Sequence, residues 1–263
     1  MAHQNIYQHW SSRKVERLFF DSSVGRISYI RREGKGILLF IHGFTASSDI
    51  WKDLIEKMDS RFSIISIDLF GHGGSGLPNL QYNDFSLRKL IRTQSEAIFE
   101  LLDHLKVKEY SMIASSFGGL ISIDLATSFL KPERLVLIDS AGLTPGGDRK
   151  FENGFKALMS FYANETSRHL YPIAEIFKSL DRGEQLINPV IARNVDFPIC
   201  IIWGSEDYIF DPEYGRKFSN LFSRTEFHII EGAGHTPFTT HQKEVAEIIN
   251  KFIFTNISSH HKH

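Results

Sequence analysis

Three residues of types that act together in nucleophilic catalysis stand far apart in this sequence: Ser116, Asp207 and His235. A serine hydroxyl becomes a good nucleophile only when a neighbouring base removes its proton, and histidine is the usual base. The histidine needs a carboxylate that fixes its tautomer and stabilises its charged form. If the fold brings the three side chains together, these residue types predict acyl transfer through a covalent intermediate.

Ser116 is predicted to lie at a sharp turn between a strand over residues 107–113 and a helix over 120–130, where apolar residues recur at helical spacing. Small residues before and after the serine allow such a turn. This is the pattern of a nucleophile elbow, G-x-S-x-G, with Ala114 in place of the first glycine. Ser115 is a rival nucleophile, but the residues two positions before and after it are bulky. We therefore favour Ser116.

The candidate acid and base each follow a segment that reads as a buried strand. Asp207 comes after the apolar run 199–203, and His235 comes after 225–231 in a Gly-Ala-Gly-His loop. Both also have a purely structural interpretation, because an aspartate after a strand often caps the next helix. Asp139, at the end of an earlier apolar strand, is a rival acid.

Acyl transfer also needs hydrogen-bond donors for the oxyanion that forms at the substrate carbonyl. We expect the backbone N–H groups of Phe117, next to the serine, and of Phe44, in the loop after the strand 37–41. His42 and His72 are expected to be structural. No set of His, Cys, Asp and Glu has zinc-binding spacing, so neither a metal nor another cofactor is predicted.

The order of apolar segments predicts the fold class. Two antiparallel strands, 17–22 and 26–32, come first, and strands that are apolar on both faces then alternate with amphipathic helices. This is typical of an α/β protein with a doubly wound, mostly parallel sheet covered by helices on both sides. In such a sheet ligands bind beyond the carboxyl ends of the strands, where all the loops named above should lie. Residues 1–17 are polar and are expected to form a loosely attached arm.

The alternation breaks over residues 140–197, where no convincing buried strand occurs. A loop of this length is implausible in a compact domain, so an inserted helical lid at 143–192 is predicted. The core then comprises residues 1–142 and 193–263. Apolar lid side chains are candidates to contact the substrate, although each of them could instead pack the lid on the core. These candidates are Phe155, Leu158, Phe161 and Phe177.

Taken together, the motifs resemble those of the α/β-hydrolase superfamily over roughly residues 17–254. The matching residues are His42-Gly43-Phe44, Asp68, Gly71-His72-Gly73, Ser75, Ser116-Phe117-Gly118-Gly119, Gly204, Asp207 and Gly234-His235. The resemblance implies the α/β-hydrolase fold, a Ser116-Asp207-His235 triad and an inserted lid. It leaves the substrate open, because one fold hosts many chemistries.

The motifs also indicate which enzyme groups of the superfamily this chain resembles. Epoxide and haloalkane hydrolases of this superfamily carry aspartate at the elbow, which disfavours them here. The Ser-Phe-Gly-Gly stretch resembles hydrolases that cleave carbon–carbon bonds of ring-fission products, whereas His-Gly-Phe-Thr is similar to carboxylesterases and to a lyase of menaquinone synthesis. We expect a carboxylesterase for short-to-medium acyl or aryl esters. The alternatives are one of those two enzymes on the same triad, or a non-catalytic small-molecule receptor.

Composition constrains the partners and the location. The chain has 263 residues, 42% hydrophobic and 23% charged, with a formal net charge of −1. Nothing in this balance favours nucleic acid or an anionic membrane, so the expected partner is a small-molecule ester. Cys200, the single cysteine, lies in an apolar run and is expected to be buried and inert. The N-terminus has no apolar signal segment, and a cytoplasmic location is expected.

Overall fold

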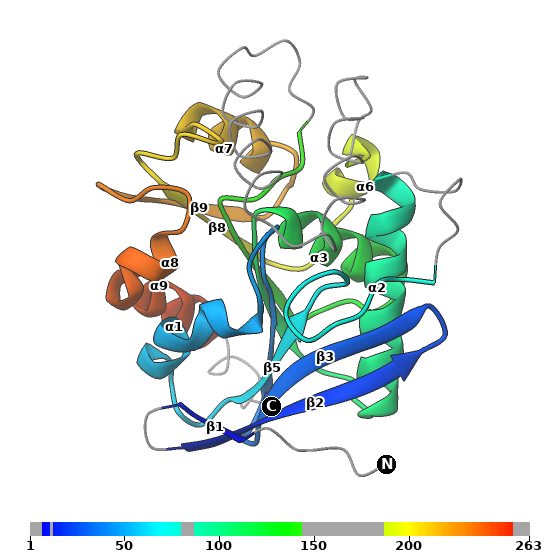
Figure 1. Ribbon diagram of the computed structural model, residues 1–263. Helices are drawn as coiled ribbons and strands as arrows, with labels where there is room; N and C mark the ends of the chain where they lie inside the picture. The colour runs from blue at the N-terminus through cyan, green and yellow to red at the C-terminus, as the bar shows by residue number, and fades with distance from the viewer. Residues whose placement is uncertain (1–6, 11–12, 80–86, 144–186, 255–263) are drawn as a thin grey trace, which may run out of the picture.

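A computed structural model describes residues 7–10, 13–79, 87–143 and 187–254 (Figure 1). The strands in chain order are β1 (Tyr7–Trp10), β2 (Arg13–Ser22), β3 (Gly25–Arg32), β4 (Ile37–Ile41), β5 (Ser63–Asp68), β6 (Ser111–Ser115), β7 (Arg134–Ile138), β8 (Ile199–Gly204) and β9 (Thr225–Ile230). They form one sheet in the order β1-β2-β3-β5-β4-β6-β7-β8-β9. The first three strands and β5 pair antiparallel, and all pairs from β5 to β9 are parallel.

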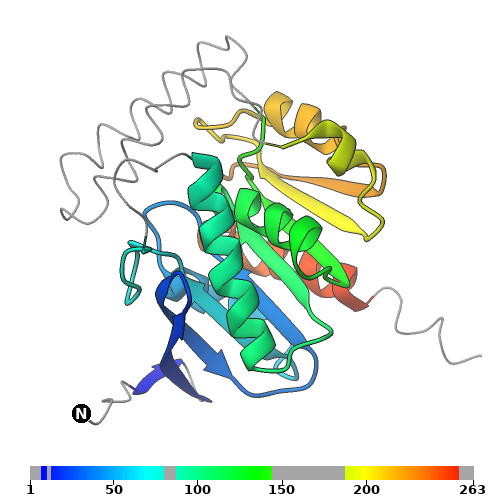
Figure 2. The same cartoon turned by 90° about the vertical axis from the view of Figure 1, so that its right-hand side faces the viewer.

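Helices cover both faces of this sheet. They are the 3₁₀ turn η1 (Ser48–Trp51) and the helices α1 (Lys52–Lys57), α2 (Leu87–His104), α3 (Phe117–Ser128), α6 (Pro189–Arg193), α7 (Pro212–Ser219), α8 (Pro237–Thr240) and α9 (Gln242–Phe254). Figure 2 shows α2 and α3 side by side in front of the sheet, with α9 behind it. The predicted doubly wound, mostly parallel α/β fold is therefore confirmed.

The strand β4 explains why both faces must be covered. Its alternate side chains Leu39 and Ile41 belong to the apolar core under α2 and α3. Leu38 and Phe40 point to the other core, under α1 and α9. All four are buried. A strand that is apolar on both sides is stable only between two layers of helices.

The N-terminal segment differs from the expectation of a loosely attached arm. β1 pairs antiparallel with β2, and β2 begins at Arg13, ahead of the predicted start at residue 17. Pairing at the edge of a sheet uses backbone hydrogen bonds, which every residue except proline can make. A polar segment without apolar alternation therefore joins the sheet although its side-chain pattern gives no signal.

The insertion between β7 and α6 is described only at its two ends. Most of the predicted lid, and the four lid side chains proposed to contact substrate, lie outside the described residues. Ile187, which is buried, and α6 return the chain to the face covered by α2 and α3. The lid and the domain boundaries stay predictions.

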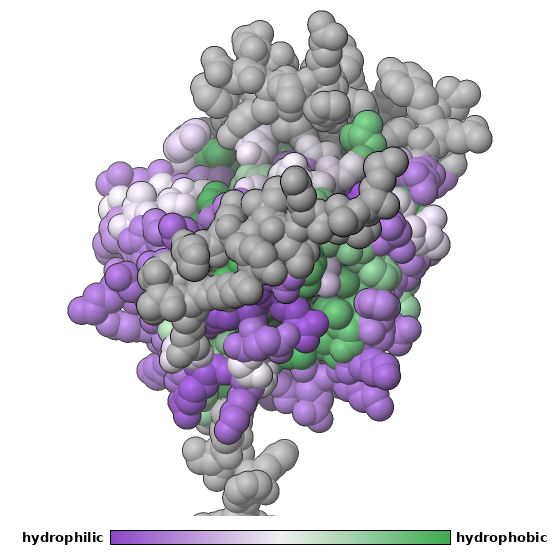
Figure 3. Space-filling view, turned by 60° about the horizontal axis from the view of Figure 1, so that its bottom comes forward, coloured by the Kyte–Doolittle hydropathy of each residue, from purple (hydrophilic) through white to green (hydrophobic). Residues whose placement is uncertain are grey.

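The surface gives few apolar areas in the part of the chain that the structure describes. Figure 3 shows a face on which hydrophilic side chains surround smaller apolar areas. The exposed large apolar side chains are Phe19, Leu77, Val190, Ile191 and Tyr208. No helix among the described residues is long and apolar enough to cross a membrane. Cys200 is buried as predicted, and burial raises the pKa of its thiol.

Candidate active site

Ser116 stands at a strained turn between β6 and α3. Its backbone has φ 51° and ψ −120°, a region that residues other than glycine rarely occupy. Three hydrogen bonds hold it there: its N–H donates to the Ile138 carbonyl (3.0 Å), and its own carbonyl accepts from Gly119 N–H (3.0 Å) and Ala141 N–H (3.1 Å). Ser115, by contrast, belongs to β6 and is 2% exposed. The turn therefore presents Ser116 and not Ser115.

Two glycines let α3 begin directly after this serine. A Cβ on Gly118 would lie 2.4 Å from the Ile41 carbonyl oxygen, and one on Gly119 would lie 1.9 Å from Ser140 Oγ. Both distances are shorter than any tolerable contact, so the close approach of α3 to the sheet requires glycine at these positions.

His235 lies between the serine and an aspartate. Its Nε2 is 3.0 Å from Ser116 Oγ, and its Nδ1 is 2.8 Å from Asp207 Oδ2. The loops after β8 and β9 meet because Glu206 N–H donates to the Ala233 carbonyl (2.8 Å). The Asp207 side chain is fully buried and that of His235 is 12% exposed. Serine, imidazole and carboxylate thus form one chain of hydrogen bonds, although they are up to 119 positions apart.

Backbone donors hold the carboxylate of Asp207 in place. Its Oδ1 accepts from Ile209 N–H (2.8 Å) and Phe210 N–H (3.1 Å), which leaves Oδ2 to face His235. The ring of Phe210 also packs against the imidazole, with 5.4 Å between ring centroids. The orientation of His235 is therefore set by groups that are themselves fixed.

The loop after β4 packs directly against the serine. A Cβ on Gly43 would lie 2.9 Å from Ser116 Cβ and 3.6 Å from Ser116 Oγ. The ring of Phe44 contacts that of Phe117 edge to face, at 6.3 Å between centroids. The two backbone segments predicted to bind an oxyanion are thus neighbours on either side of Ser116.

Two buried histidines connect this loop to the one after β5. Leu69 N–H donates to His42 Nε2 (3.0 Å), and His42 Nδ1 lies 2.6 Å from the carbonyl of the next residue. Thr45 N–H donates to His72 Nε2 (3.0 Å), and His72 Nδ1 lies 2.9 Å from the Phe70 carbonyl. Since each Nε2 accepts, each ring is neutral with its proton on Nδ1. As predicted, these two histidines have structural contacts.

Burial lowers the pKa of both rings. For His72 desolvation, followed by repulsion from His42, brings the pKa down to about 3. For His42 desolvation outweighs the hydrogen bond to the Gly43 carbonyl and the attraction of Asp68, and its pKa is also below the usual value. Protonation of either ring would remove an acceptor that a backbone N–H needs.

Asp68, at the end of β5, anchors the same region. Its fully buried carboxylate accepts from Ser48 N–H (2.7 Å) and Gly74 N–H (2.9 Å) and pairs with Arg17. Arg17 also pairs with Asp49 at 2.6 Å. Burial opposes the charge of Asp68, but these hydrogen bonds and the Arg17 guanidinium outweigh it, so the pKa of the carboxyl is lowered.

The comparison with protein families now bears on this geometry. The family described as Alpha/beta hydrolase family matches residues 38–248, which is more than half of the chain. The chain belongs to this family. The match spans β4 to α9 and includes each of the three hydrogen-bonded residues.

Relatives of this α/β hydrolase carry several activities. The chain is 29% identical to a 2-(acetamidomethylene)succinate hydrolase of Mesorhizobium japonicum, over 89% of this chain and 92% of that protein. It is 24% identical to a 2-hydroxy-6-oxo-6-(2'-aminophenyl)hexa-2,4-dienoic acid hydrolase of Metapseudomonas resinovorans, over 95% and 94%. Among solved structures, a thermophilic esterase from Thermogutta terrifontis superposes with a TM-score of 0.71 at 16% identity, over 91% and 98%. That structural likeness shows the fold alone.

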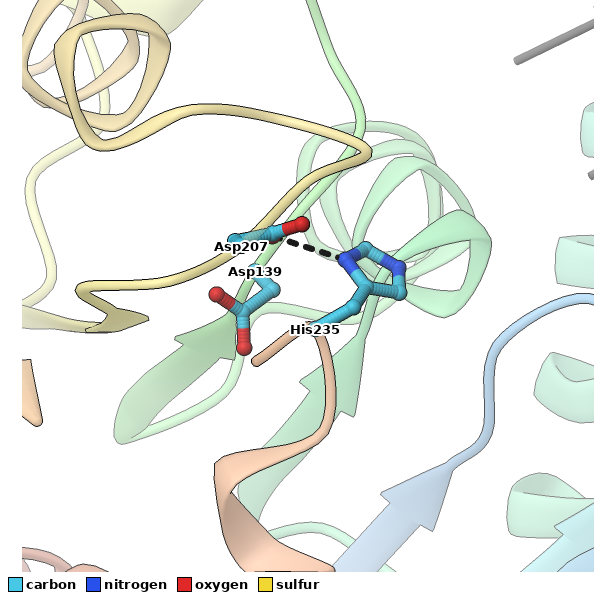
Figure 4. A group of neighbouring side chains, drawn as sticks. All are labelled: Asp139, Asp207 and His235. Carbon is cyan, nitrogen blue, oxygen red and sulfur yellow. Dashed lines mark hydrogen bonds and ion pairs between the residues drawn. The ribbon is translucent and has the colours of Figure 1, made fainter. Parts of the chain in front are cut away.

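A second carboxyl group lies beside the Asp207–His235 pair of this α/β hydrolase, a relation that sequence reasoning did not predict. Asp139, considered above as a rival to Asp207, does not contact Ser116 or replace Asp207. It lies beside Asp207 and His235, with one ligand-type atom of each within 4.8 Å of the others (Figure 4). In the described part of the chain this is the one group of three His, Cys, Asp or Glu side chains close enough to share a cation.

Tyr214 was also missed, because nothing in the sequence distinguishes it from a core tyrosine. Its hydroxyl accepts from Gly142 N–H (2.9 Å) and Leu143 N–H (2.8 Å), where the insertion begins. Its ring stacks on Phe210, at 4.8 Å between centroids. Tyr214 thereby ties the start of the insertion to the loop that carries Asp207. Asp211 caps α7 by accepting a hydrogen bond from Tyr214 N–H (2.9 Å).

We expect Gly43→Ala to lower kcat by about 10- to 100-fold, because a misplacement of less than 1 Å at the reacting groups has effects of this size. The new Cβ would press on Ser116 Cβ at 2.9 Å and move the serine or the loop. Steady-state kinetics with a chromogenic ester, together with thermal melting, measures the effect. Gly76→Ala is the control, since a Cβ there meets only the Arg26 carbonyl, at 3.7 Å. Equal kcat for both variants would contradict the prediction.

We expect the free energy of unfolding to fall as pH drops below about 6.5, the ordinary pKa of histidine. The folded protein excludes protons from His42 and His72 that the unfolded chain accepts, so each ring contributes a slope of up to about 1.4 kcal/mol per pH unit. For His72 this slope extends to about pH 3. The lowered pKa of Asp68 adds a loss in the same direction at lower pH, below the usual carboxyl range.

Urea unfolding between pH 7 and pH 4.5 measures this dependence. His72→Gln keeps an acceptor for Thr45 N–H but cannot titrate, and it should flatten the slope. His228→Gln is the control, because His228 is at the surface and its ion pair is with the exposed Glu226. The idea fails if the wild type and His72→Gln lose stability with the same slope.

Proposed function

We propose that this α/β hydrolase cleaves carboxylic esters with short-to-medium acyl or aryl groups, with Ser116 as the nucleophile. The observation that carries the proposal is the hydrogen-bonded series Ser116 Oγ, His235 and Asp207, with distances of 3.0 Å and 2.8 Å. The small-molecule ester is the proposed partner, and the proposed steps need no cofactor or metal.

In the proposed reaction His235 Nε2 takes the proton of Ser116 as Oγ attacks the ester carbonyl. Nδ1–H donates to Asp207, which keeps Nε2 free to accept and stabilises the imidazolium that forms. The protonated Nε2 then gives its proton to the leaving alcohol. A water molecule, deprotonated by the same nitrogen, attacks the acyl-enzyme and releases the carboxylic acid and the free serine.

The negative oxygen of the tetrahedral intermediate is proposed to bind at the N–H groups of Phe44 and Phe117. Phe117 is the first residue of α3, so its N–H points out of the helix N-terminus, where negative charge is stabilised. The packing of Gly43 on Ser116 brings the loop of Phe44 to the same place. Loss of one such donor typically costs about 3–4 kcal/mol in enzymes with an oxyanion hole. The lid residues Phe155, Leu158, Phe161 and Phe177 are proposed to contribute apolar contacts to the acyl or aryl group.

A fluorophosphonate probe and a panel of nitrophenyl esters test the proposal. We expect turnover of nitrophenyl acetate and butyrate, with the probe attached to Ser116 and found there by mass spectrometry of peptides. Labelling of a different serine would contradict the assigned nucleophile. Tight binding of esters without turnover would instead indicate a non-catalytic receptor.

A second candidate is hydrolysis of a carbon–carbon bond in a ring-fission dienoate, or a lyase reaction, on the same three residues. The observation that favours the hydrolysis is the relative from Metapseudomonas resinovorans, which matches almost the whole chain at 24% identity. A ring-fission dienoate in the same panel separates the two hydrolytic reactions. Higher kcat/KM for the dienoate than for every ester would replace the first proposal by the second.

A further inference from the structure

Asp139 is a buried carboxyl group that the proposed reaction does not use. It follows β7 and is fully buried, with a left-handed backbone at φ 44°. Its N–H donates to the Ile202 carbonyl (3.0 Å), and its Oδ1 accepts from Gly204 N–H (2.9 Å). These bonds attach it to β8, just before the loop that carries Asp207. Aspartate tolerates this region better than most residues, but such conformations still cost energy and cluster at functional sites.

The second carboxylate oxygen of Asp139 accepts no hydrogen bond among the described residues. With Asp139 ionised, Oδ2 is buried and has no hydrogen-bond partner. Asp139 lies next to Asp207 and His235 (Figure 4), and one carboxylate oxygen of each aspartate lies within 4.8 Å of the other. Two buried carboxylates at this distance repel each other, and in the described part of the chain neither forms an ion pair with lysine or arginine.

A single proton on Asp139 removes both problems. It cancels one of the two charges and turns Oδ2 from an unsatisfied acceptor into a donor that can reach Asp207. Burial, followed by the charge of Asp207, holds the pKa of Asp139 well above its usual range. The other titratable groups around the pair are His235 after β9 and Tyr214 of α7, whose hydroxyl bonds to the start of the insertion.

We propose that Asp139 is a neutral carboxylic acid that donates a hydrogen bond to Asp207, and that it acts as a positioning residue for the His235–Asp207 pair. This role rests on the proposed function. Asp207 then accepts four hydrogen bonds, from Ile209 N–H, Phe210 N–H, His235 and Asp139, and its carboxylate cannot rotate away from the imidazole. When Asp139 loses its proton as the pH rises, the donor becomes a repelling charge and activity should fall.

Asparagine at position 139 imitates the neutral acid. Gly204 N–H requires an acceptor, so the amide oxygen would take the place of Oδ1 and the NH₂ group would point at Asp207 as a donor. Alanine removes the donor altogether. Asp124→Asn is the matched control, because Asp124 lies on α3, is partly buried and pairs with Arg92 at 2.8 Å.

We expect Asp139→Asn to keep kcat/KM for nitrophenyl butyrate within about threefold of wild type at pH 7, and to lack the alkaline decline in activity that we expect for the wild type. Asp139→Ala should lower kcat about 10- to 100-fold, the usual effect of losing a hydrogen bond to a charged group, with little change in KM. Asp124→Asn should retain both the rate and the alkaline decline. Infrared difference spectra of wild type against Asp139→Asn should contain the carbonyl stretch of a protonated carboxylic acid at pH 7.

Each of the opposite results overturns the proposal. They are the absence of the protonated-acid band, a loss in Asp139→Asn as large as in Asp207→Asn, and equal kcat at pH 7 for Asp139→Ala and Asp139→Asn. Loss of activity with a chelator, restored by a divalent cation, would assign the three side chains to a metal ion instead. The infrared band does not depend on turnover. A protein that has the band but hydrolyses no ester therefore contradicts the proposed function alone.

Discussion

Ser116→Ala should lower kcat for nitrophenyl butyrate by about 10⁴- to 10⁶-fold, leaving only the modest rate that binding and oxyanion stabilisation supply. The reason is that no other described hydroxyl is hydrogen-bonded to His235 Nε2. The variant should melt near the temperature of the wild type, because alanine removes only the side-chain oxygen and keeps the backbone hydrogen bonds of residue 116. Steady-state rates and labelling by a fluorophosphonate measure the two consequences.

Ser115→Ala is the matched control. Ser115 is the neighbouring serine, but it is buried within β6 and makes no contact with His235. This variant should keep the rate within a few-fold and should still be labelled. If Ser116→Ala retained more than about one hundredth of the wild-type kcat, the assigned nucleophile would be wrong.

Asp207→Asn should lower kcat by about ten-thousand-fold, through the tautomer of His235 rather than through loss of structure. The two backbone N–H groups of Ile209 and Phe210 require an acceptor, so the amide oxygen must occupy the place of Oδ1. The NH₂ group then points at His235 Nδ1, which must accept. The ring proton moves to Nε2, where it faces Ser116 Oγ and prevents that nitrogen from acting as a base.

The pH profile and a matched variant test this explanation. Asp211→Asn makes the same chemical change four residues away, where asparagine caps a helix as well as aspartate does, so it should keep both rate and stability. Asp139→Asn makes the same chemical change on the adjacent carboxyl group. There the Gly204 N–H holds the amide oxygen, so the NH₂ group points at Asp207 and can donate a hydrogen bond to it. A small loss in Asp207→Asn together with a large loss in Asp139→Asn would exchange the roles of the two aspartates.

Much of this arrangement could be predicted because residues that are buried away from water must be apolar, and this requirement leaves a readable pattern in the sequence. Runs such as Ile37–Ile41, apolar on both faces, require a sheet between two helical layers, and the fold class was confirmed. Parallel strands then bring all their carboxyl ends to one edge. The loops of Ser116, Asp207 and His235 therefore had to meet once their strands were placed correctly.

Other features depend on contacts that no local pattern records. The helix α3 begins at Phe117 and not at the predicted residue 120, because Gly118 and Gly119 serve close approach rather than helix propensity. The edge strand β1 joins the sheet by antiparallel pairing with β2, which no apolar pattern indicates. The relation of Asp139 to Asp207 needs the register of β7 against β8, in which Leu137 lies opposite Ile201 and Ile138 opposite Ile202.

The bridge from Arg17 to Asp68 has a consequence for how this chain can be shortened or diversified. The guanidinium of Arg17, on β2, neutralises the buried carboxylate of Asp68, which also binds the loop after β4 through Ser48 N–H. Deleting the first strands would leave the negative charge of Asp68 buried without its partner. This costs far more stability than the loss of an edge strand does. Substitutions at positions 17 and 68 should therefore be coupled, in natural variants as in laboratory evolution. The first strands then cannot be exchanged independently of the proposed catalytic site.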